Sequence, residues 1–259
     1  MRIPTLDEYS QKYEFIRFHR EDGILQLTLH SNGGDLLWGF APHQELGHCF
    51  ADVANDLENK VVILTGSGTT FIHDEELGGG APDAATWATH VLPDAKRLLM
   101  NLLEIQAPMI AAVNGPATVH AELALLCDVV LAADHTTFQD APHYPSGLVP
   151  GDGVHVVWPM LLGMNRGRYF LMTGQELSAQ EALALGVVNE VMPQDKLLDR
   201  AWTLARKIRQ RPAITTRLTR EAMVQQLKRA MLDQLPYGLA LEGLAACDHW
   251  PETFPREKM

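Results

Sequence analysis

The sequence has little positive charge, few cysteines and no long apolar run. Its 259 residues carry 21 Lys and Arg against 32 Asp and Glu, a formal net charge of −11, which excludes a nucleic-acid binder of the ordinary basic kind. Three scattered cysteines are too few for a disulfide framework or a zinc ribbon. No apolar stretch approaches the roughly 18 residues of a membrane-spanning helix, and residues 1–15 lack a secretory pattern. We therefore expect a cytoplasmic protein with no nucleic-acid or membrane partner.

What is present is the composition of a globular protein, 46% hydrophobic and 20% charged. Alternating apolar and polar residues predict that strands over 13–18 and 23–30 open the chain as a hairpin. Helical spacing then predicts helices over residues 43–57 and 95–105 and a short helix over 121–126. Continuous apolar runs predict strands that alternate with these helices, over residues 60–65, 108–113 and 129–133. Such alternation is typical of a mostly parallel α/β core.

From residue 166 onward the pattern is helical. A helix over 178–185 begins with a capping box formed by Ser178 and Glu181, and further helices are expected over 194–209 and 215–232. We therefore expect a core over residues 1–195 and a C-terminal helical region over 196–259, without a linker composition that would mark a separate domain.

Two loops that follow predicted strands carry groups capable of chemistry. In the first, His120 and Glu122 lie at a predicted helix N-terminus, where the helix dipole is expected to lower the pKa of a histidine. The second is rich in Gly and Pro and contains His143 and Asp152, placed so that the chain can fold back and the carboxylate can orient the imidazole.

Spacing alone gives these residues no special role. A loop histidine such as His143 is usually a solvated surface residue, and Asp152 between two glycines is most often an ordinary turn residue. By the same reasoning Trp38 is a packing residue, His43 a surface residue and Glu242 a solvated helix position.

A series of blocks in the sequence resembles the crotonase (enoyl-CoA hydratase/isomerase) superfamily. The blocks occur in the family's order and occupy residues 60–71, 108–115, 122–128, 147–151, 171–174 and 182–190. The resemblance implies an α/β fold, a crotonase-like ββα superhelical spiral with a C-terminal helical region that packs trimers. It also implies a homotrimer or a dimer of trimers.

The sequence departs from the family pattern where the family binds acyl-CoA. Acids at 74–76 stand in the block that supplies one oxyanion-hole amide, and His120 replaces a glycine of the stretch that supplies the other. Glu122 aligns with the family's first catalytic glutamate, but His143 aligns with the second. The loop 30–38 contains no Lys or Arg for the CoA phosphates. These departures, together with the acidic charge, favour a neutral, phosphate-free substrate.

At these same places the sequence is similar to a subgroup of the superfamily, 6-oxocamphor hydrolase and related β-diketone hydrolases. That subgroup cleaves a carbon–carbon bond by a retro-Claisen reaction without CoA. Its motif residues fall on Trp38, His43, His120, His143, Asp152 and Glu242. The resemblance implies hydrolysis of a small, neutral cyclic or bicyclic β-diketone to a keto acid, with no cofactor and no metal.

This chemistry suggests a role for each residue. We hypothesise that neutral His143, its tautomer held by Asp152, acts with Glu242 to orient and deprotonate water. His120 and the Trp38 indole N–H would then bind a carbonyl oxygen and stabilise the developing negative charge.

The substrate pocket is expected to be mainly apolar. His43 is a further pocket residue. Trp38, Phe40, Leu77 and Trp87 are candidate lining residues, although a place in the core explains Phe40 and Trp87 more simply.

Three alternatives remain open. The first is a CoA-dependent enoyl hydratase or isomerase with Glu122 as its acid and base. The second is a metal site in which His120, His143 and a carboxylate form a facial triad. The third is a superfamily member without activity that serves as an assembly subunit.

Overall fold

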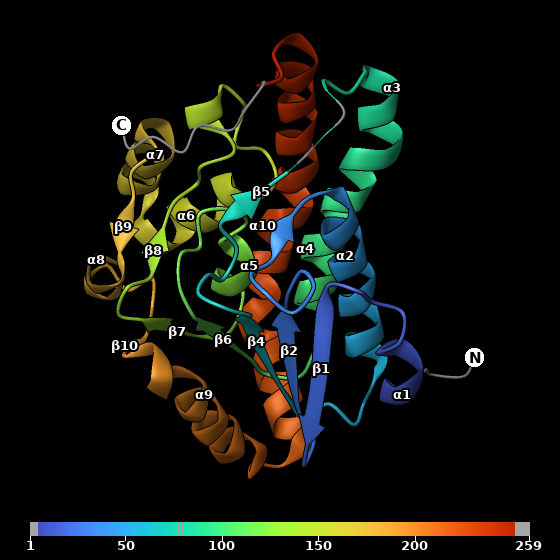
Figure 1. Ribbon diagram of the computed structural model, residues 1–259, viewed down its shortest axis with the longest axis vertical. Helices are drawn as coiled ribbons and strands as arrows, with labels where there is room; N and C mark the ends of the chain where they lie inside the picture. Colours follow the sequence, from blue (N-terminus) through green and yellow to red (C-terminus); the bar gives the residue numbers. More distant parts are fainter. Residues whose placement is uncertain (1–4, 77, 79, 252–259) are drawn as a thin grey trace.

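The computed structural model describes residues 5–76, 78 and 80–251. Its centre is a six-stranded sheet with the strand order β1-β2-β4-β6-β7-β10 (Figure 1). These strands are Ile16–Glu21, Ile24–Leu29, Val61–Gly66, Met109–Val113, Val129–Ala133 and Glu190–Met192. The pair β1 and β2 is antiparallel, and every later pairing in this sheet is parallel. The predicted α/β class and opening hairpin are therefore confirmed.

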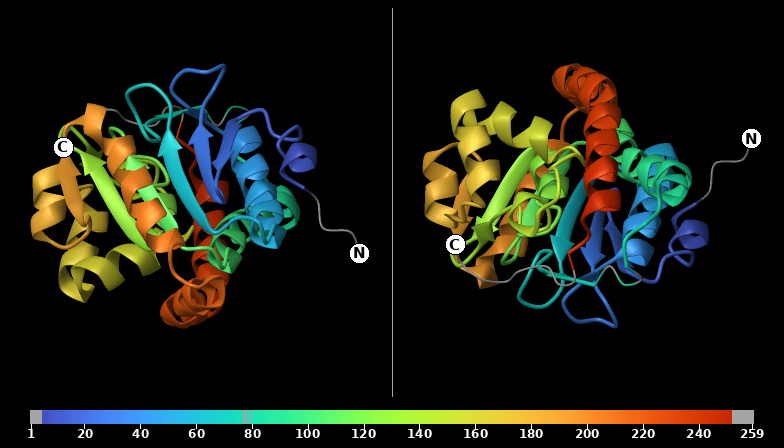
Figure 2. Two further views of the ribbon diagram at one scale, coloured as in Figure 1. Left: turned by 90° about the horizontal axis from the view of Figure 1, so that it is seen from below. Right: turned by 90° about the horizontal axis from the view of Figure 1, so that it is seen from above.

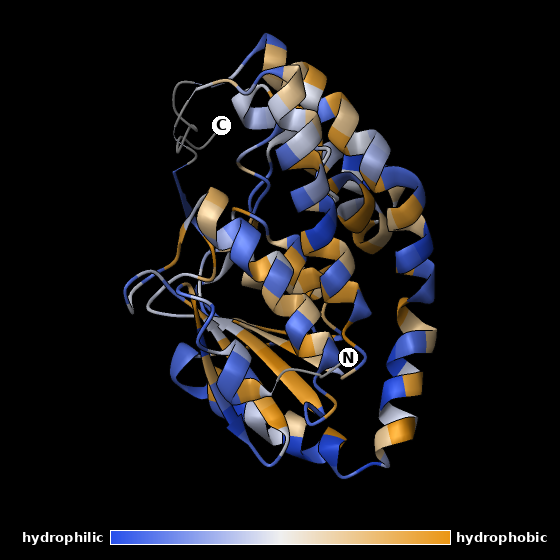
Figure 3. Cartoon of the chain, turned by 90° about the vertical axis from the view of Figure 1, so that its right-hand side faces the viewer, coloured by the Kyte–Doolittle hydropathy of each residue, from blue (hydrophilic) through white to orange (hydrophobic). Residues whose placement is uncertain are grey.

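Helices cover both faces of the sheet, which explains why its central strands are apolar throughout. On one face lie α2 (Phe40–Asn55) and α4 (Leu92–Glu104), which pack against each other, and on the other lies α9 (Gln194–Arg209) (Figure 1). Strand β4 shows the division: Val62 and Leu64 belong to the core under α2 and α4, whereas Val61 and Ile63 belong to the core under α9. Figure 3 shows these apolar strands enclosed by helices with mixed surfaces.

The remaining elements are short helices and turns, small two-stranded sheets and the later helices. The short helices and turns are α1 (Leu6–Tyr9), α3 (Ala84–Thr86), a π-helical turn (Trp87–Val91), α5 (Glu122–Leu125) and a 3-10 turn (Tyr144–Ser146). Small sheets pair β3 (Leu37–Trp38) with β5 (Asp74–Glu75), and β8 (Thr137–Phe138) with β9 (Leu177–Ser178). The later helices are α6 (Val154–Leu162), α7 (Met164–Thr173), α8 (Ala179–Ala184) and α10 (Ala213–Asp248).

Two differences from the sequence expectations concern helices. The sequence pattern did not reveal α6 because its residues are apolar on nearly every side and include Pro159. Helix α10 was expected to end at residue 232 but continues to Asp248 (orange to red in Figure 2). It continues because Leu235, Leu239, Glu242 and Ala246 lie on one buried face at helical spacing.

The C-terminal helices pack closely on the core: α9 contacts the sheet, and α10 contacts α4 and α6. The capping box of α8, formed by Ser178 and Glu181, is confirmed. Among the described residues, no helix has the length and apolar character needed to cross a membrane. The division at residue 195 and the trimer stay predictions, and light scattering would test the second.

One buried ion pair ties α10 to the sheet. The Arg220 side chain is fully buried, donates to the Asp128 carboxylate and donates from Nε to the carbonyl oxygen of Ile105 at 2.6 Å. Removing the cation leaves an uncompensated carboxylate, so we expect Arg220→Met to lower the free energy of unfolding by about 3–5 kcal/mol. Urea denaturation measures this loss, with Arg229→Met at an exposed position of the same helix as the control. Equal stability of the two variants would contradict the assignment.

Candidate active site

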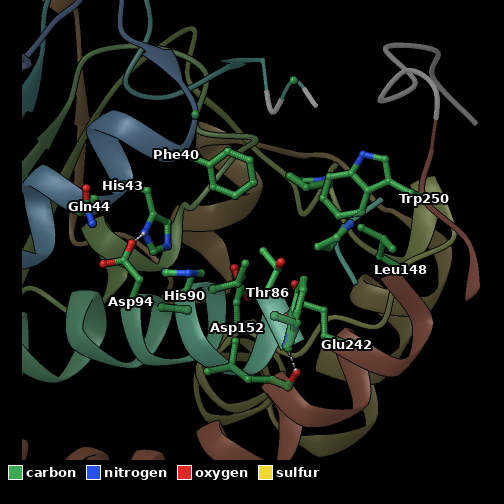
Figure 4. Close-up of a pocket in the computed structure, with 18 of the residues that line it drawn as sticks. Phe40, His43, Gln44, Thr86, His90, Asp94, Leu148, Asp152, Glu242 and Trp250 are labelled. Carbon is green, nitrogen blue, oxygen red and sulfur yellow. Dashed lines mark hydrogen bonds and ion pairs between the residues drawn. The ribbon is translucent and has the colours of Figure 1, made fainter. Parts of the chain in front are cut away.

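A cavity of about 910 Å³ brings together most of the residues singled out in the sequence. Figure 4 shows it from the side, with Asp152 and Glu242 on its floor and Phe40 and Trp250 at its upper edge. The side chains come from separate elements: Trp38 from β3, His43 from α2, His120 and His143 from the loops after β6 and β8, Asp152 from the loop before α6, and Glu242 from α10.

The backbone at His120 has an unusual conformation. Its φ is +46°, in the left-handed region where a residue with a Cβ is disfavoured by about 1–2 kcal/mol. This is the position at which the resembled family has a glycine. A histidine in this strained conformation favours a functional role for its ring.

The imidazole of His120 is held by two carboxylates. Its Nδ1 lies 2.6 Å from Oε1 of Glu122 and 3.5 Å from Oδ2 of Asp152, and its ring centroid lies 4.4 Å from that of Trp38. Burial alone would lower the pKa of His120, but the Glu122 carboxylate, followed by those of Asp152 and Glu75, raises it to about 9. The expectation that a helix dipole lowers this pKa is therefore wrong.

His143 is held differently from the sequence hypothesis. Its Nδ1 donates to Oδ1 of Asp140 at 2.6 Å, whereas its Nε2 lies 3.5 Å from Oδ2 of Asp152 and 3.8 Å from Oε1 of Glu242. Asp140, not Asp152, thus makes the short contact with the His143 ring. Burial works to lower the pKa of His143, but these carboxylates raise it well above its usual value. The resting side chain is an imidazolium rather than the expected neutral ring.

Asp152 lies between the two imidazoles. Burial would raise its pKa, but His143 and His120 hold it below its usual value, so Asp152 is ionised. A close backbone contact brings its loop against α10: a Cβ added at Gly151 would lie 2.2 Å from the carbonyl oxygen of Gly238. Only glycine permits this approach, which places Asp152 beside Glu242.

Glu242 is buried, with 8% of its surface exposed, and its Oε2 has no hydrogen-bond partner among the described residues. It is therefore not the solvated helix position that the local sequence suggested. Burial raises the pKa of Glu242 to about 8, against the lowering effect of His143. A carboxyl group of this kind can exchange a proton near neutral pH.

Glu75 is a further acid that the sequence did not single out as a site residue. Of the acids at 74–76, it lines the cavity, and the parallel pairing of β5 with β3 places it opposite Trp38. Burial raises the pKa of Glu75 to about 7, against the lowering effects of His120 and His143.

Asp35, in the loop without Lys or Arg, accepts hydrogen bonds from the backbone N–H groups of Thr69 and Thr70.

His43 lies beside the rings of Trp38 and His120. Its Nδ1 is 2.7 Å from Oδ2 of Asp94, and its ring centroid lies 5.5 Å from those of Trp38 and His120. Burial lowers the pKa of His43. It therefore adds a neutral polar group to the cavity wall.

The apolar lining differs in part from expectation. Phe40 is not a core residue: 52% of its surface is exposed, at the edge of the cavity. Trp87 is both a core and a lining residue, 6% exposed, with its indole N–H donating to the carbonyl oxygen of Leu239 at 2.8 Å. Leu77, the remaining candidate, lies outside the described residues.

One group of side chains has the spacing of metal ligands. Atoms of His120, Glu122 and Asp152 lie within 4.8 Å of one another. This group differs from the expected triad, because His143 is not part of it. The short contact between Nδ1 of His120 and Glu122 accounts for the closeness of these two side chains.

Together, the fold and the site define a class of enzyme, an α/β protein with an acid–base cluster at the carboxyl ends of parallel strands. The family model described as enoyl-CoA hydratase/isomerase matches residues 38–241. The chain therefore belongs to the enoyl-CoA hydratase/isomerase family, the crotonase superfamily, and the fold expected from the resemblance is confirmed.

Individual relatives differ in their activities. A β-diketone hydrolase from the cyanobacterium Anabaena sp., solved with (S)-3-oxocyclohexyl acetic acid bound, is 45% identical with a TM-score of 0.91, over 93% of this chain and 97% of that one. An enoyl-CoA hydratase/isomerase from Mycobacterium paratuberculosis is 26% identical with a TM-score of 0.81, over 90% and 94%. A carnitinyl-CoA dehydratase from Salmonella arizonae is 34% identical over 82% of this chain and 84% of that protein.

Proposed function

We propose that this protein hydrolyses a carbon–carbon bond of a neutral cyclic or bicyclic β-diketone, without CoA, to give a keto acid. The observation that carries the proposal is the cluster in which ionised Asp152 lies 3.5 Å from both His120 and His143, beside Glu242. The similarity to the Anabaena β-diketone hydrolase supports the same conclusion.

In this mechanism His120 binds the carbonyl that water attacks. Its Nδ1 faces Glu122 and Asp152, so Nε2 is the nitrogen left to face the substrate. As an imidazolium, it donates a hydrogen bond that strengthens when negative charge develops on the oxygen. The Trp38 ring lies against it at a tilt of 41° and offers its indole N–H as a second donor.

Glu242 takes a proton from water and later gives it to the carbon that leaves. The oxygen of water bonds to the carbonyl carbon while its proton passes to Glu242. The bond to the carbon between the two carbonyls then breaks, and its electron pair forms an enolate with the second carbonyl. Glu242 returns its proton to that carbon, so one water is added and no other reactant is needed. The charged ring of His143, 3.8 Å from Glu242, stabilises the ionised form of the Glu242 carboxyl group.

The pH dependence follows from two of these groups. Glu242 acts as a base only when it is ionised, above its pKa of about 8, and His120 donates only while it is protonated, below its pKa of about 9. We therefore expect kcat/KM to rise through pH 8 and to fall above pH 9. Initial rates of diketone loss from pH 6 to 10 measure this profile. A flat profile, or one that falls through pH 8, would contradict the assignment.

The second candidate is a CoA-dependent reaction, favoured by the similarity to carnitinyl-CoA dehydratase and by the retention of Glu122. Its weakness is that Glu122 is fully buried and bonded to His120. Two measurements separate the candidates: a screen of cyclic and bicyclic 1,3-diketones by ultraviolet absorbance, and calorimetry with an enoyl-CoA at modest salt. Turnover of a diketone without tight CoA binding supports the hydrolase, and the opposite result supports the second candidate.

A further inference from the structure

Asp140 is a buried carboxylate that the mechanism above does not use. It lies in the loop after β8, with 4% of its surface exposed. Its Oδ1 is 2.6 Å from Nδ1 of His143, and the residue stands behind that ring, outside the lining of the cavity. Asp140 therefore cannot touch the substrate and can act only through His143.

The loop itself is held by other bonds. The N–H of Ala141 donates to the carbonyl oxygen of Thr118 at 3.0 Å, and the N–H groups of Ser146 and Leu148 both donate to the carbonyl oxygen of His143 at 2.9 Å. Within the part of the chain that the structure describes, Oδ2 of Asp140 has no hydrogen-bond partner. The contact of this carboxylate is thus directed at the imidazole rather than at the backbone.

The other contacts of the His143 ring are too long to fix it. Its Nε2 lies 3.5 Å from Asp152 and 3.8 Å from Glu242, both beyond the range of a strong charged hydrogen bond. Rotation of the ring by half a turn about the Cβ–Cγ bond would exchange Nε2 with Cε1 and so place a carbon on this side. The bond to Asp140 is the short contact that prevents such a rotation.

We propose, on the basis of the proposed hydrolysis, that Asp140 is a positioning residue that holds the His143 ring with Nε2 facing Asp152 and Glu242. It performs for His143 the task that Glu122 performs for His120, so each ring has its own outer carboxylate and both share Asp152.

The charge of Asp140 has a second effect on the same ring. Titratable groups on several elements face His143: Asp140, Asp152, Glu242, Glu75, His120 and His155. Among the carboxylates, Asp140 makes the shortest contact. Removing its negative charge is therefore expected to lower the pKa of His143 while the other groups remain in place.

The test compares Asp140→Asn with wild type. Asparagine keeps the size of the side chain and an oxygen that can accept from Nδ1, but it removes the charge. Asp140→Ala removes the anchor altogether. Asp134→Asn is the matched control, because Asp134 also contacts a histidine, His135, but is exposed. Two readouts are needed: the kcat and KM of diketone hydrolysis, and the NMR titration of the His143 ring nitrogens, assigned with His143→Gln.

We expect Asp140→Asn to lower the pKa of His143 and to reduce kcat on the order of 100-fold with little change in KM, while Asp134→Asn behaves as wild type. An Asp140→Asn variant with wild-type kcat and a wild-type His143 titration would overturn the proposal. If wild type hydrolyses no diketone, the proposed function fails, but the titration still decides the role of Asp140. An unchanged pKa and tautomer of His143 in Asp140→Ala would then exclude it.

Discussion

Asp152→Asn is expected to reduce kcat by about 10³-fold, within the range that positioned acid–base groups contribute. The amide keeps the shape of the side chain but removes the negative charge that lies 3.5 Å from both His120 and His143. Both rings lose stabilisation of their charged forms, so their pKa values fall together. Stopped assays of diketone loss measure kcat, and circular dichroism confirms the fold.

A matched control separates this effect from a general loss of negative charge in the cavity. Asp83 also lines the cavity, but its side chain caps α3 by accepting from the N–H of Thr86. An asparagine can still accept that bond. Asp83→Asn should therefore retain near wild-type turnover. Equal losses in the two variants would mean that Asp152 has no special role.

His120→Ala is expected to lower kcat by about 10²–10³-fold, the usual effect of removing a donor to a developing oxyanion. The loss should fall on kcat more than on KM, because the bond strengthens only as charge develops. His120→Gln keeps an N–H donor and should recover part of the rate.

His135→Ala is the control for this variant. His135 also lies beside an aspartate, at 3.5 Å from Asp134, but 44% of its side chain is exposed, so its loss should leave kcat unchanged. A His120→Ala enzyme that stays folded and keeps wild-type kcat would remove His120 from the mechanism.

Much of the fold could be predicted from the sequence because its signals are local. The continuous apolar run of β4 and the capping box of Ser178 and Glu181 each depend on neighbouring residues, and both are present in the structure. The later half of α10 could not be predicted in this way, since its buried face is defined by the distant elements α4 and α6.

The contacts within the site, like the later half of α10, depend on residues that are distant in the sequence. The resemblance supplied His120, His143, Asp152 and Glu242, and the structure places all of them at one cavity. It could not supply the partner of each ring nitrogen. Asp140 looks like a turn residue in a loop rich in proline and glycine, and only the folded chain shows its contact of 2.6 Å with His143.

The charge states also depend on the fold. A helix N-terminus suggested a lowered pKa for His120, but the neighbouring carboxylate of Glu122, followed by those of Asp152 and Glu75 from more distant parts of the chain, raises it to about 9. No local pattern reports how many acids will converge on one ring. For this reason His143, expected to be a neutral base, is assigned as a cation, whereas the expected role of His120 in binding a carbonyl oxygen is kept.

The most direct test of the account is the incubation of the purified enzyme, without CoA, with the bicyclic 1,3-diketone whose hydrolysis gives 3-oxocyclohexyl acetic acid. Ultraviolet absorbance follows loss of the diketone, and mass spectrometry identifies the product. The account predicts a keto acid heavier than the substrate by one water, formed by wild type and about 10³-fold more slowly by Asp152→Asn. An unchanged diketone, together with conversion of an enoyl-CoA or carnitinyl-CoA by the same folded preparation, would contradict it.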